Sequence, residues 1–182
     1  MNKIQKSLRL VLVLLIICAT AVSMFGCSET PVSVGTNPTL SGNSPTESKD
    51  PVFKVGEIVE LGDTVISLIS VTENEGSTYV MPAEGNVFIL CEFEISNNSS
   101  ADLTISSMLN FEAYCDDYVC NYSISALMQK GDKSQLDGTI AAGKKMKGVI
   151  GYEVPQDWKE LEVHFTSDIL SSKEVVFVAT ND

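Results

Sequence analysis

Residues Val87–Ile95, with the sequence VFILCEFEI, decide the fold. Every odd-numbered position in this stretch is apolar, whereas the even-numbered positions change from apolar to acidic along the chain. Side chains alternate between the two faces of a β-strand, so this spacing predicts a strand with one core face and one face that becomes polar. The sequence NNSS at 97–100 is typical of a turn and ends the strand.

The segments on both sides of this strand continue the same pattern. Alternating or β-branched runs are predicted as strands at Thr64–Val71, Phe111–Cys115, Tyr118–Ile124, Gly143–Val154, Leu161–Phe165 and Val175–Ala179. Residues 125–130 are predicted to form a short helical turn. Short strands at roughly ten-residue spacing, with turn residues between them, are typical of a sandwich or barrel. The sequence therefore predicts an all-β domain.

The start of the chain has the three parts of an export signal. A basic start is followed by an apolar run from Leu10 to Val22 and then by Met24-Phe25-Gly26-Cys27, and no acidic residue precedes Glu29. This order resembles a bacterial lipoprotein signal, in which Cys27 is lipidated and becomes the first residue of the mature protein. The alternatives are an uncleaved membrane anchor, which needs about 20 apolar residues, and simple secretion.

The signal divides the chain into three predicted segments. They are a signal peptide at 1–26, a lipidated cysteine with a flexible linker at 27–50, and a domain at 51–182. The linker is rich in Ser, Thr, Pro, Gly and Asn, and it has too little apolar surface to offset the entropy of ordering. As a coil of about 23 residues it spans roughly 25–30 Å and serves as a spacer. We expect a protein on the extracytoplasmic face of a bacterial, Gram-positive cell membrane, held by its acyl chains.

The charge of the mature chain narrows the range of partners. Every arginine and three of the twelve basic residues lie in 1–26, so nine lysines remain against 24 acidic residues, a formal charge of −15. Nucleic-acid binding depends on neutralising phosphates with Lys and Arg. The same shortage of basic residues argues against docking on anionic lipid head groups. We therefore expect no nucleic-acid partner.

Several short motifs occur along the domain in a characteristic order. Phe53-Lys54-Val55-Gly56-Glu57 opens it, Gly85-Asn86-Val87-Phe88 starts the long strand, and Ala142-Gly143-Lys144 precedes the stretch GVIGYEVP at Gly148–Pro155. This order resembles a bacterial lipoprotein domain of unknown function that is grouped by fold with the mycobacterial immunoprotective extracellular antigens. The resemblance covers nearly all of 51–182 and implies an immunoglobulin-like antiparallel β-sandwich. It implies no catalytic residues.

Three cysteines lie within the domain, and export places them where disulfides form. Cys115 and Cys120 flank Asp116-Asp117-Tyr118-Val119, and a hairpin with a four-residue loop brings their Cα atoms within the bridging range of about 4.4–6.8 Å. We predict a disulfide between them. Cys91 alternates with core residues and is predicted to be a buried free thiol. The C-x4-C spacing differs from that of thioredoxin-type redox sites.

The sequence contains no convincing catalytic or metal constellation. His164 is the only histidine, and its spacing places it on a strand face with Glu162, where we expect it to be exposed. One imidazole cannot build a multi-histidine zinc site. No G-x-S-x-G elbow marks a nucleophile. We predict no enzyme, no catalytic residues, no metal and no cofactor.

Two acidic features have both a structural and a functional interpretation. Asp116, Asp117 and Asn121 offer oxygen ligands at a turn, but calcium takes six to eight oxygens and no calcium-loop motif is present. The Glu73–Glu84 loop is long and polar, and long loops often carry recognition. We favour the structural interpretation for both.

Trp158 and a cluster of three lysines can also be interpreted either as structural residues or as binding residues. Trp158 follows Asp157 in a turn, where it either caps the core or anchors a partner. Lys144, Lys145 and Lys147 form the one dense basic cluster, which is interpreted as a solvated strand end that protects an edge or as a polyanion site. The core and strand-end interpretations are preferred.

The sequence thus favours a membrane-anchored binding module without enzymatic activity. It predicts binding of a protein, a peptide or an envelope component through loops or an edge strand, and it leaves the ligand-binding residues open. The alternative is a cation- or small-ligand-binding lipoprotein that uses the acidic turns. A hydrolase is the third and weakest hypothesis.

Overall fold

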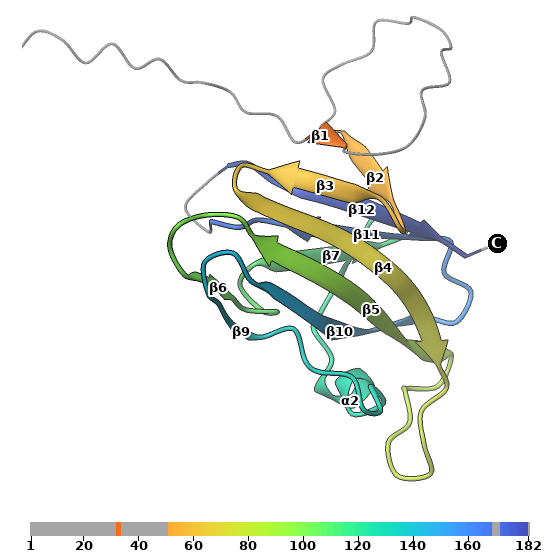
Figure 1. Cartoon of the computed structure of the whole chain (residues 1–182). Coiled ribbons are helices and arrows are strands. Elements are labelled where there is room, and N and C mark those ends of the chain that lie inside the picture. The colour runs from red at the N-terminus through yellow and green to blue at the C-terminus, as the bar shows by residue number, and fades with distance from the viewer. Residues whose placement is uncertain (1–31, 34–50, 169–171, 182) are drawn as a thin grey trace, which may run out of the picture.

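The predicted strand 87–95 lies inside β5 (Asn86–Asn97), an interior strand of one of two facing sheets (Figure 1). The computed structural model describes residues 32–33, 51–168 and 172–181. The first sheet has the order β1 (Val32–Ser33), β3 (Ile58–Leu61), β4 (Thr64–Asn74), β5 and β10 (Lys145–Pro155). All its pairs are antiparallel, and β5 is hydrogen-bonded along both edges.

The second sheet lies behind the first in Figure 1. Its order is β2 (Val52–Lys54), β12 (Val175–Thr180), β11 (Glu160–Phe165), β7 (Phe111–Cys115) and β8 (Tyr118–Cys120). A small ribbon of β6 (Leu103–Ile105) and β9 (Gly138–Ile140) and the short helix α2 (Ile124–Leu127) complete the elements. The predicted immunoglobulin-like β-sandwich is confirmed. One pair departs from the antiparallel pattern, because β2 runs parallel to β12.

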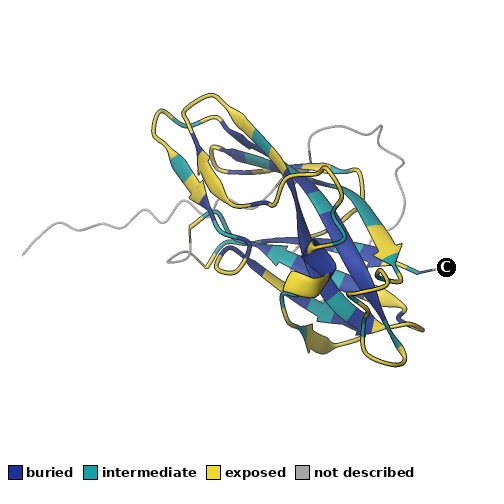
Figure 2. Ribbon diagram, turned by 90° about the horizontal axis from the view of Figure 1, so that it is seen from below, coloured by how far each residue is buried: buried dark blue, intermediate teal, exposed yellow. Residues whose placement is uncertain are grey.

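The core lies between the two sheets, and buried residues follow the strands while exposed residues gather in the connections (Figure 2). A chain of ring contacts links the sheets. Phe93 of β5 lies 5.1 Å from Phe111 and 6.0 Å from Phe177, and Phe111 lies 5.0 Å from Phe165. Offset and edge-on aromatic pairs add about 0.5–1.5 kcal/mol each beyond their buried area. The odd-numbered face of β5 is therefore the main core face, as the alternation predicts.

The outer face of β5 is also partly buried. Phe88 and Leu90 are 0% and 7% exposed, because α2 and the chain that follows it cross this face of the sheet. We call residues 123–136 the crossing chain. The crossing chain needs a glycine on β10. A Cβ added to Gly151 would lie 2.7 Å from the Leu127 backbone nitrogen and 2.9 Å from the Ala126 Cβ. These distances show that Gly151 is required for close packing of α2 on the sheet.

A second glycine of the GVIGYEVP stretch, Gly148, leaves room for the next part of the crossing chain to approach β10. Residues 134–136 bond to the free edge of β10, through Val149 N–H to the Ser134 carbonyl at 2.9 Å and Leu136 N–H to the Val149 carbonyl at 3.1 Å. A Cβ added to Gly148 would lie 2.8 Å from the Leu136 nitrogen. The glycines of the motif therefore have a packing role, and the crossing chain covers part of an edge that would otherwise be open to pairing.

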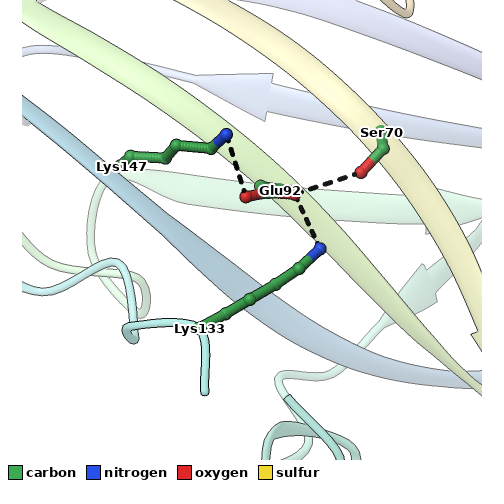
Figure 3. Close-up of polar contacts among 4 residues, drawn as sticks. All are labelled: Ser70, Glu92, Lys133 and Lys147. Atoms are coloured by element: carbon green, nitrogen blue, oxygen red, sulfur yellow. Dashed lines mark hydrogen bonds and ion pairs between the residues drawn. The ribbon is translucent and has the colours of Figure 1, made fainter. Parts of the chain in front are cut away.

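The polar half of the outer face is organised around Glu92 (Figure 3). Its carboxylate accepts from the Lys133 ammonium at 2.7 Å, lies 3.3 Å from the Lys147 ammonium and accepts from the Ser70 hydroxyl at 3.4 Å. The hydrogen bond from Lys133 is the largest cause that lowers the pKa of this carboxyl. Because Lys133 belongs to the crossing chain, the carboxylate ties that chain to β4, β5 and β10.

The hairpin of β7 and β8 turns in the gap that the predicted strands 111–115 and 118–124 leave, at Asp116 and Asp117, with φ of 48° and 69°. The four-residue loop between Cys115 and Cys120, on which the disulfide prediction relied, does not form. Positive φ at both central positions is the pattern of a type I′ turn, which suits the twist of adjacent strands. The shorter turn pairs Cys115 with Tyr118, and it pairs Cys120 with Ala113.

The predicted linker contributes one short element to the sandwich. Val32 and Ser33 form β1, which pairs antiparallel with Glu60 and Val59 of β3. An edge strand offers unpaired backbone groups, and this pairing uses them. The predicted signal peptide 1–26, the lipidation site Cys27 and the rest of 27–50 lie outside the described residues. Within the residues that the structure describes, no helix is both long and apolar enough to cross a membrane.

Candidate functional site

The two ends of the sandwich differ in charge. We call residues 73–86, 116–117, 153–160 and 180–181 the acidic end, and residues 61–64, 97–103, 106–110, 141–145, 166–168 and 172–174 the opposite end. The acidic end carries Glu73, Glu75, Glu84, Asp116, Asp117, Glu153, Asp157 and Glu160, against Lys159. The opposite end carries Asp63, Asp102, Asp168 and Glu174, against Lys144, Lys145 and Lys173. Most of the excess negative charge on the connections thus lies at one end.

Two carboxylates at the acidic end hold neighbouring segments together. Glu73, at the end of β4, accepts from the Trp158 indole N–H at 2.6 Å and from the Asn181 amide at 3.2 Å. Glu153, near the end of β10, accepts from the Ala83 N–H at 2.8 Å and from the Asn86 amide at 3.0 Å. These bonds connect the β4–β5 loop, the β10–β11 turn and the end of the described chain. The segments of the acidic end are therefore held in a defined arrangement.

Asp116 has a similar structural role. Its carboxylate oxygens accept from the backbone N–H groups of Lys159 and Glu160 at 2.8–3.1 Å. The sequence analysis considered Asp116, Asp117 and Asn121 as cation ligands, with the structural turn preferred. Within the described residues, no group of three or more His, Cys, Asp and Glu side chains is arranged to hold a metal ion. The observed contacts of Asp116 agree with the structural interpretation.

The β4–β5 loop presents large apolar side chains to solvent. Tyr79 is 95% exposed and Met81 is 71% exposed, although the loop around them is hydrogen-bonded. Ser77 and Val80 exchange backbone bonds of 2.7 and 3.2 Å, and the Asn74 side chain accepts from the Gly76 N–H at 2.7 Å. Gly76 has a φ of +88°, and an added Cβ would overlap the Val80 carbonyl oxygen. The loop thus has a defined conformation with its apolar residues outward.

Two grooves open at this end, one on each side of the β10–β11 turn. The larger, of about 760 Å³, is lined by Val52, Val55 and Val71 with the Glu73 carboxylate and Trp158. The smaller, of about 400 Å³, lies beside the β7–β8 hairpin, and its lining includes Tyr118, Val119, Pro155, Asp157 and Lys159. Apolar walls with carboxylates at the rim suit a partner that combines apolar and basic groups.

The cysteines lie where the hairpin meets the core. Cys91 is fully buried, as predicted, and burial raises the pKa of its thiol. Burial also raises the pKa of Cys115, and it raises that of Cys120 to about 12. The Cys120 thiol donates to the Tyr118 carbonyl oxygen, at 3.8 Å from its sulfur. These raised pKa values leave the thiols protonated at neutral pH, which disfavours nucleophilic chemistry.

The pairing of the strands places Cys115 and Cys120 diagonally on one face of the hairpin. Diagonal neighbours in an antiparallel ladder have Cα atoms about 7–8 Å apart. This spacing is slightly longer than the disulfide range of about 4.4–6.8 Å. Both cysteines are free thiols in the structure, so the predicted disulfide needs a small backbone movement, and it stays a prediction.

His164 lies on the outer face of the second sheet, on the same strand as Glu162. Its side chain is 20% exposed, less than the sequence analysis expected. The imidazole is placed between two carboxylates, with Nε2 3.3 Å from Glu162 and Nδ1 3.2 Å from Glu174, and its ring is edge-on to Tyr114 at 5.3 Å. Both ring nitrogens of His164 thus have a carboxylate partner within the second sheet and its adjoining loop.

The remaining candidates also have structural partners. Trp158 is 3% exposed and packs in the core, which confirms the preferred interpretation. Lys145 pairs with Glu94 at 3.0 Å and Lys147 pairs with Glu92 at 3.3 Å. Lys144 lies at the turn before β10, and its carbonyl accepts from the Asn97 N–H at 2.9 Å. The three lysines therefore line one strand end, and two of them are paired with acids of β5.

Sequence reasoning missed two features of this surface. It did not find Tyr79 and Met81 as the exposed residues of the Glu73–Glu84 loop, although two large apolar residues in a polar loop are a usable signal. It also missed the role of Glu73 and Glu153, because their partners lie between 67 and 108 positions away in the chain. No local pattern reports such contacts.

Comparison with known proteins places the chain in a wider group. The structure is similar to the yjhA protein from Bacillus subtilis, at 16% identity and a TM-score of 0.55, over 69% of this chain and 97% of that one. It is also similar to ycdA from Bacillus subtilis, described as a candidate lipoprotein, at 17% identity and a TM-score of 0.54, over 64% of this chain. This chain spans only about a third of ycdA, 36%. At these identities the likeness shows the fold.

A third solved structure is the secreted protein MPT63 from Mycobacterium tuberculosis, at 14% identity and a TM-score of 0.43, over 74% of this chain and all of that one, 100%. A search of curated proteins finds no match. The sequence profile of the domain of unknown function DUF4352 matches residues 53–176, which is most of the sandwich. The chain therefore belongs to the DUF4352 family.

Proposed function

We propose that this chain is a lipoprotein, anchored through Cys27 to the extracytoplasmic face of a bacterial cell membrane, whose sandwich is a binding module without enzymatic activity. The partner class is a protein, a peptide or an envelope component that is basic and partly apolar. The proposed recognition surface is the acidic end, with its loop 75–84 and the two adjoining grooves.

The anchoring part of the proposal is supported by the sequence of the first 27 residues. The basic start, the apolar run and Gly26-Cys27 are the parts that lipid attachment requires. The description of ycdA as a candidate lipoprotein is in agreement with this assignment for a protein of the same fold. Two acyl chains are sufficient for stable attachment, whereas one gives only marginal binding.

The binding part of the proposal depends on one observation. Tyr79, the most exposed large hydrophobic residue in the described part of the chain, is displayed by a hydrogen-bonded loop at the end of the sandwich that carries eight acidic residues against one lysine. A loop that is ordered before binding loses less entropy when it binds, and Tyr offers a large contact area with few rotatable bonds. Carboxylates at the rim increase the rate of encounter with a basic partner.

Cation binding by the acidic end is the alternative function, and the tests below distinguish it from binding of a basic partner. The acidic end supplies many oxygens, but the carboxylates of Glu73, Glu153 and Asp116 already accept hydrogen bonds from protein groups. A calcium ion would have to compete with these bonds to collect the six to eight oxygens that it takes.

The anchoring is tested with Cys27→Ala in cells that are fed a labelled fatty acid. We expect the variant to incorporate no label and to remain unprocessed or be released, because the thiol that accepts the lipid and forms the thioether is lost. Cys91→Ala is the matched control and should be labelled as the native chain is. Normal labelling of Cys27→Ala would falsify the lipoprotein assignment.

The binding is tested on a soluble form that begins at Ser28 and so retains β1. Amide chemical shifts are followed by NMR during titration with an unstructured peptide of Lys, Leu and Gly. We expect changes confined to the acidic end, weakened by high salt and by the double variant E75K/E84K. The matched control D63K/D102K at the opposite end should bind as before.

The same titration separates the alternatives. Shifts at the opposite end, or none with this cationic peptide, would rule out recognition by the acidic end. A titration with calcium chloride that gives saturable shifts around Asp116 and Asp117 would support the cation-binding alternative instead. A peptide with Glu in place of Lys controls for contacts made by its apolar residues alone.

A further inference from the structure

The place where the tether joins the sandwich determines which end can face the membrane. β1 runs antiparallel to β3, with Val32 opposite Glu60 and Ser33 opposite Val59. Because β3 leads into the turn at Gly62 and Asp63, β1 begins, at Val32, on the side of that same turn. The tether therefore enters the domain at the edge of the first sheet, close to the opposite end.

The tether between the lipid and this entry point is short. Only residues 28–31 separate Cys27 from Val32, and an extended chain spans at most about 3.3–3.6 Å per residue. Five such steps give a reach of about 16–18 Å. Residues 34–50 connect β1 to β2 and so add nothing to this reach. The spacer of 27–50 expected from the sequence is thereby reduced to its first few residues.

This reach is shorter than the sandwich. Val32 lies opposite Glu60, which lies opposite Val65 of β4, and β4 continues for nine more residues to Asn74 at the acidic end. At about 3.3 Å per residue, the acidic end begins about 30 Å from the entry point. For the domain to stand on its acidic end, the tether would have to span that distance, and it cannot.

Charge and surface chemistry select among the remaining orientations. The acidic end is repelled by an anionic leaflet, whereas the opposite end carries Lys144, Lys145 and Lys173 and has nearly balanced charge. Met108 and Leu109, in the β6–β7 connection at the opposite end, are 69% and 67% exposed. Leu109 lines a pocket together with Lys173, and a basic residue beside an exposed apolar residue suits a lipid interface.

We propose that the domain stands on the lipid head groups with its opposite end, so that the acidic end and its loop 75–84 point away from the membrane. In Figure 1 the opposite end is at the left and the acidic end is at the right. This inference rests on the proposed lipid anchoring at Cys27. The acyl chains supply the attachment, because the shortage of basic residues argues against docking on anionic head groups by charge alone. The phospholipid surface is then the surface that the opposite end faces, and the acidic end is left free for a soluble or envelope partner.

The orientation is measured with the lipidated chain in vesicles of equal parts phosphatidylcholine and phosphatidylglycerol that contain a dansyl-labelled lipid. Trp158 is the single tryptophan and lies at the acidic end, so it reports the height of that end by energy transfer. The double variant M108W/W158F moves the donor to the opposite end. We expect transfer from this variant to exceed that from the native chain several-fold, and we expect the emission of its donor at position 108 to shift to the blue when the chain is moved from detergent-free buffer into vesicles.

A second variant tests the physical cause. Insertion of twelve Gly and Ser residues after Glu29 lengthens the tether by an end-to-end distance of about 17–20 Å. We expect the difference in transfer between the two donors to shrink, because the longer tether permits other orientations. Circular dichroism of each variant confirms that the sandwich is intact, and M108F/W158F sets the background transfer.

The outcomes distinguish this inference from the lipid anchoring itself. A chain that does not co-float with vesicles overturns both. A chain that floats but shows equal transfer from the two donors, or greater transfer from Trp158, overturns the orientation alone. Greater transfer from the opposite end that is unchanged by the inserted residues would retain the orientation and assign it to surface chemistry instead of the short tether.

Discussion

The two faces of β5 are made of one sequence but are buried in different ways. The inner face packs against strands of the second sheet, and each of its residues 87, 89, 91, 93 and 95 is buried in one continuous core. The apolar part of the outer face is buried where α2 crosses it, and the polar part beyond it is organised around Glu92. The alternation of apolar residues thus specifies the core face. Burial of the outer face depends instead on α2, a segment distant in sequence that can pack closely only because residue 151 is a glycine.

The largest effect is expected on the inner face. Phe93→Ala removes a fully buried ring that contacts both Phe111 and Phe177 of the second sheet. We expect the free energy of unfolding to fall by about 3–5 kcal/mol, from lost transfer energy and the cavity left behind. Chemical denaturation followed by circular dichroism measures it. A loss under about 1 kcal/mol would contradict a tightly packed inner face.

On the outer face, Gly151→Val tests the seat of the crossing helix. Its Cβ would lie 2.7 Å from the Leu127 nitrogen, so α2 must move away from the sheet. We expect a loss of about 2–3 kcal/mol from overpacking, together with faster amide exchange around Ala126. Lys145→Val, on the same strand and exposed, is the control and should have little effect. Equal effects of the two substitutions would mean that the helix is not held at this place.

The hairpin cysteines give a smaller effect that also probes the inner face. We expect oxidised protein to contain a Cys115–Cys120 link, and C115S/C120S to lose about 1–2 kcal/mol, because the closed loop is short and the diagonal spacing adds strain. Peptide mapping without reduction identifies the link. Cys91 should react with thiol reagents only after unfolding. A link from Cys91 to either hairpin cysteine would refute this pairing.

The smallest effect is expected at the polar half of the outer face. Glu92→Gln removes the charge that pairs with Lys133 and Lys147 and should cost about 1 kcal/mol or less. Since the folded-state pKa of Glu92 is lowered, its stabilisation is present above the unfolded-state pKa of about 4.3 and is lost as the pH falls through the folded-state pKa.

The pH dependence is measured by denaturation of the native chain and of Glu92→Gln between neutral pH and pH 3. We expect the two stability curves to converge as the solution is acidified. Glu94→Gln, whose carboxylate is 40% exposed and pairs with Lys145, is the matched control with a smaller difference. A gap that stays constant over the whole range would show that the carboxylate's charge is not the stabilising feature.

Much of the sandwich was predictable from local patterns. The alternation in 87–95, the β7 strand at 111–115 and the burial of Trp158 are where the sequence placed them, because side-chain period and turn residues are local properties. The gap between the predicted strands 111–115 and 118–124 also placed the turn at Asp116 and Asp117, but no glycine indicated the positive φ values that these residues adopt. The acidic residues were visible in the sequence, but their gathering at one end was not.

By itself, the amino-acid sequence determined the fold class, the net charge and the inner face of β5, because each follows from composition or from neighbours a few residues apart. Only the tertiary structure decided that Phe88 and Leu90 are covered by α2, that Glu73 holds Trp158 and Asn181, and that Val32 and Ser33 join the tether to β3. The physical reason is that each of these contacts joins segments far apart in the chain. Such contacts are selected by the geometry of the packed sheets and leave no periodic signal in the sequence.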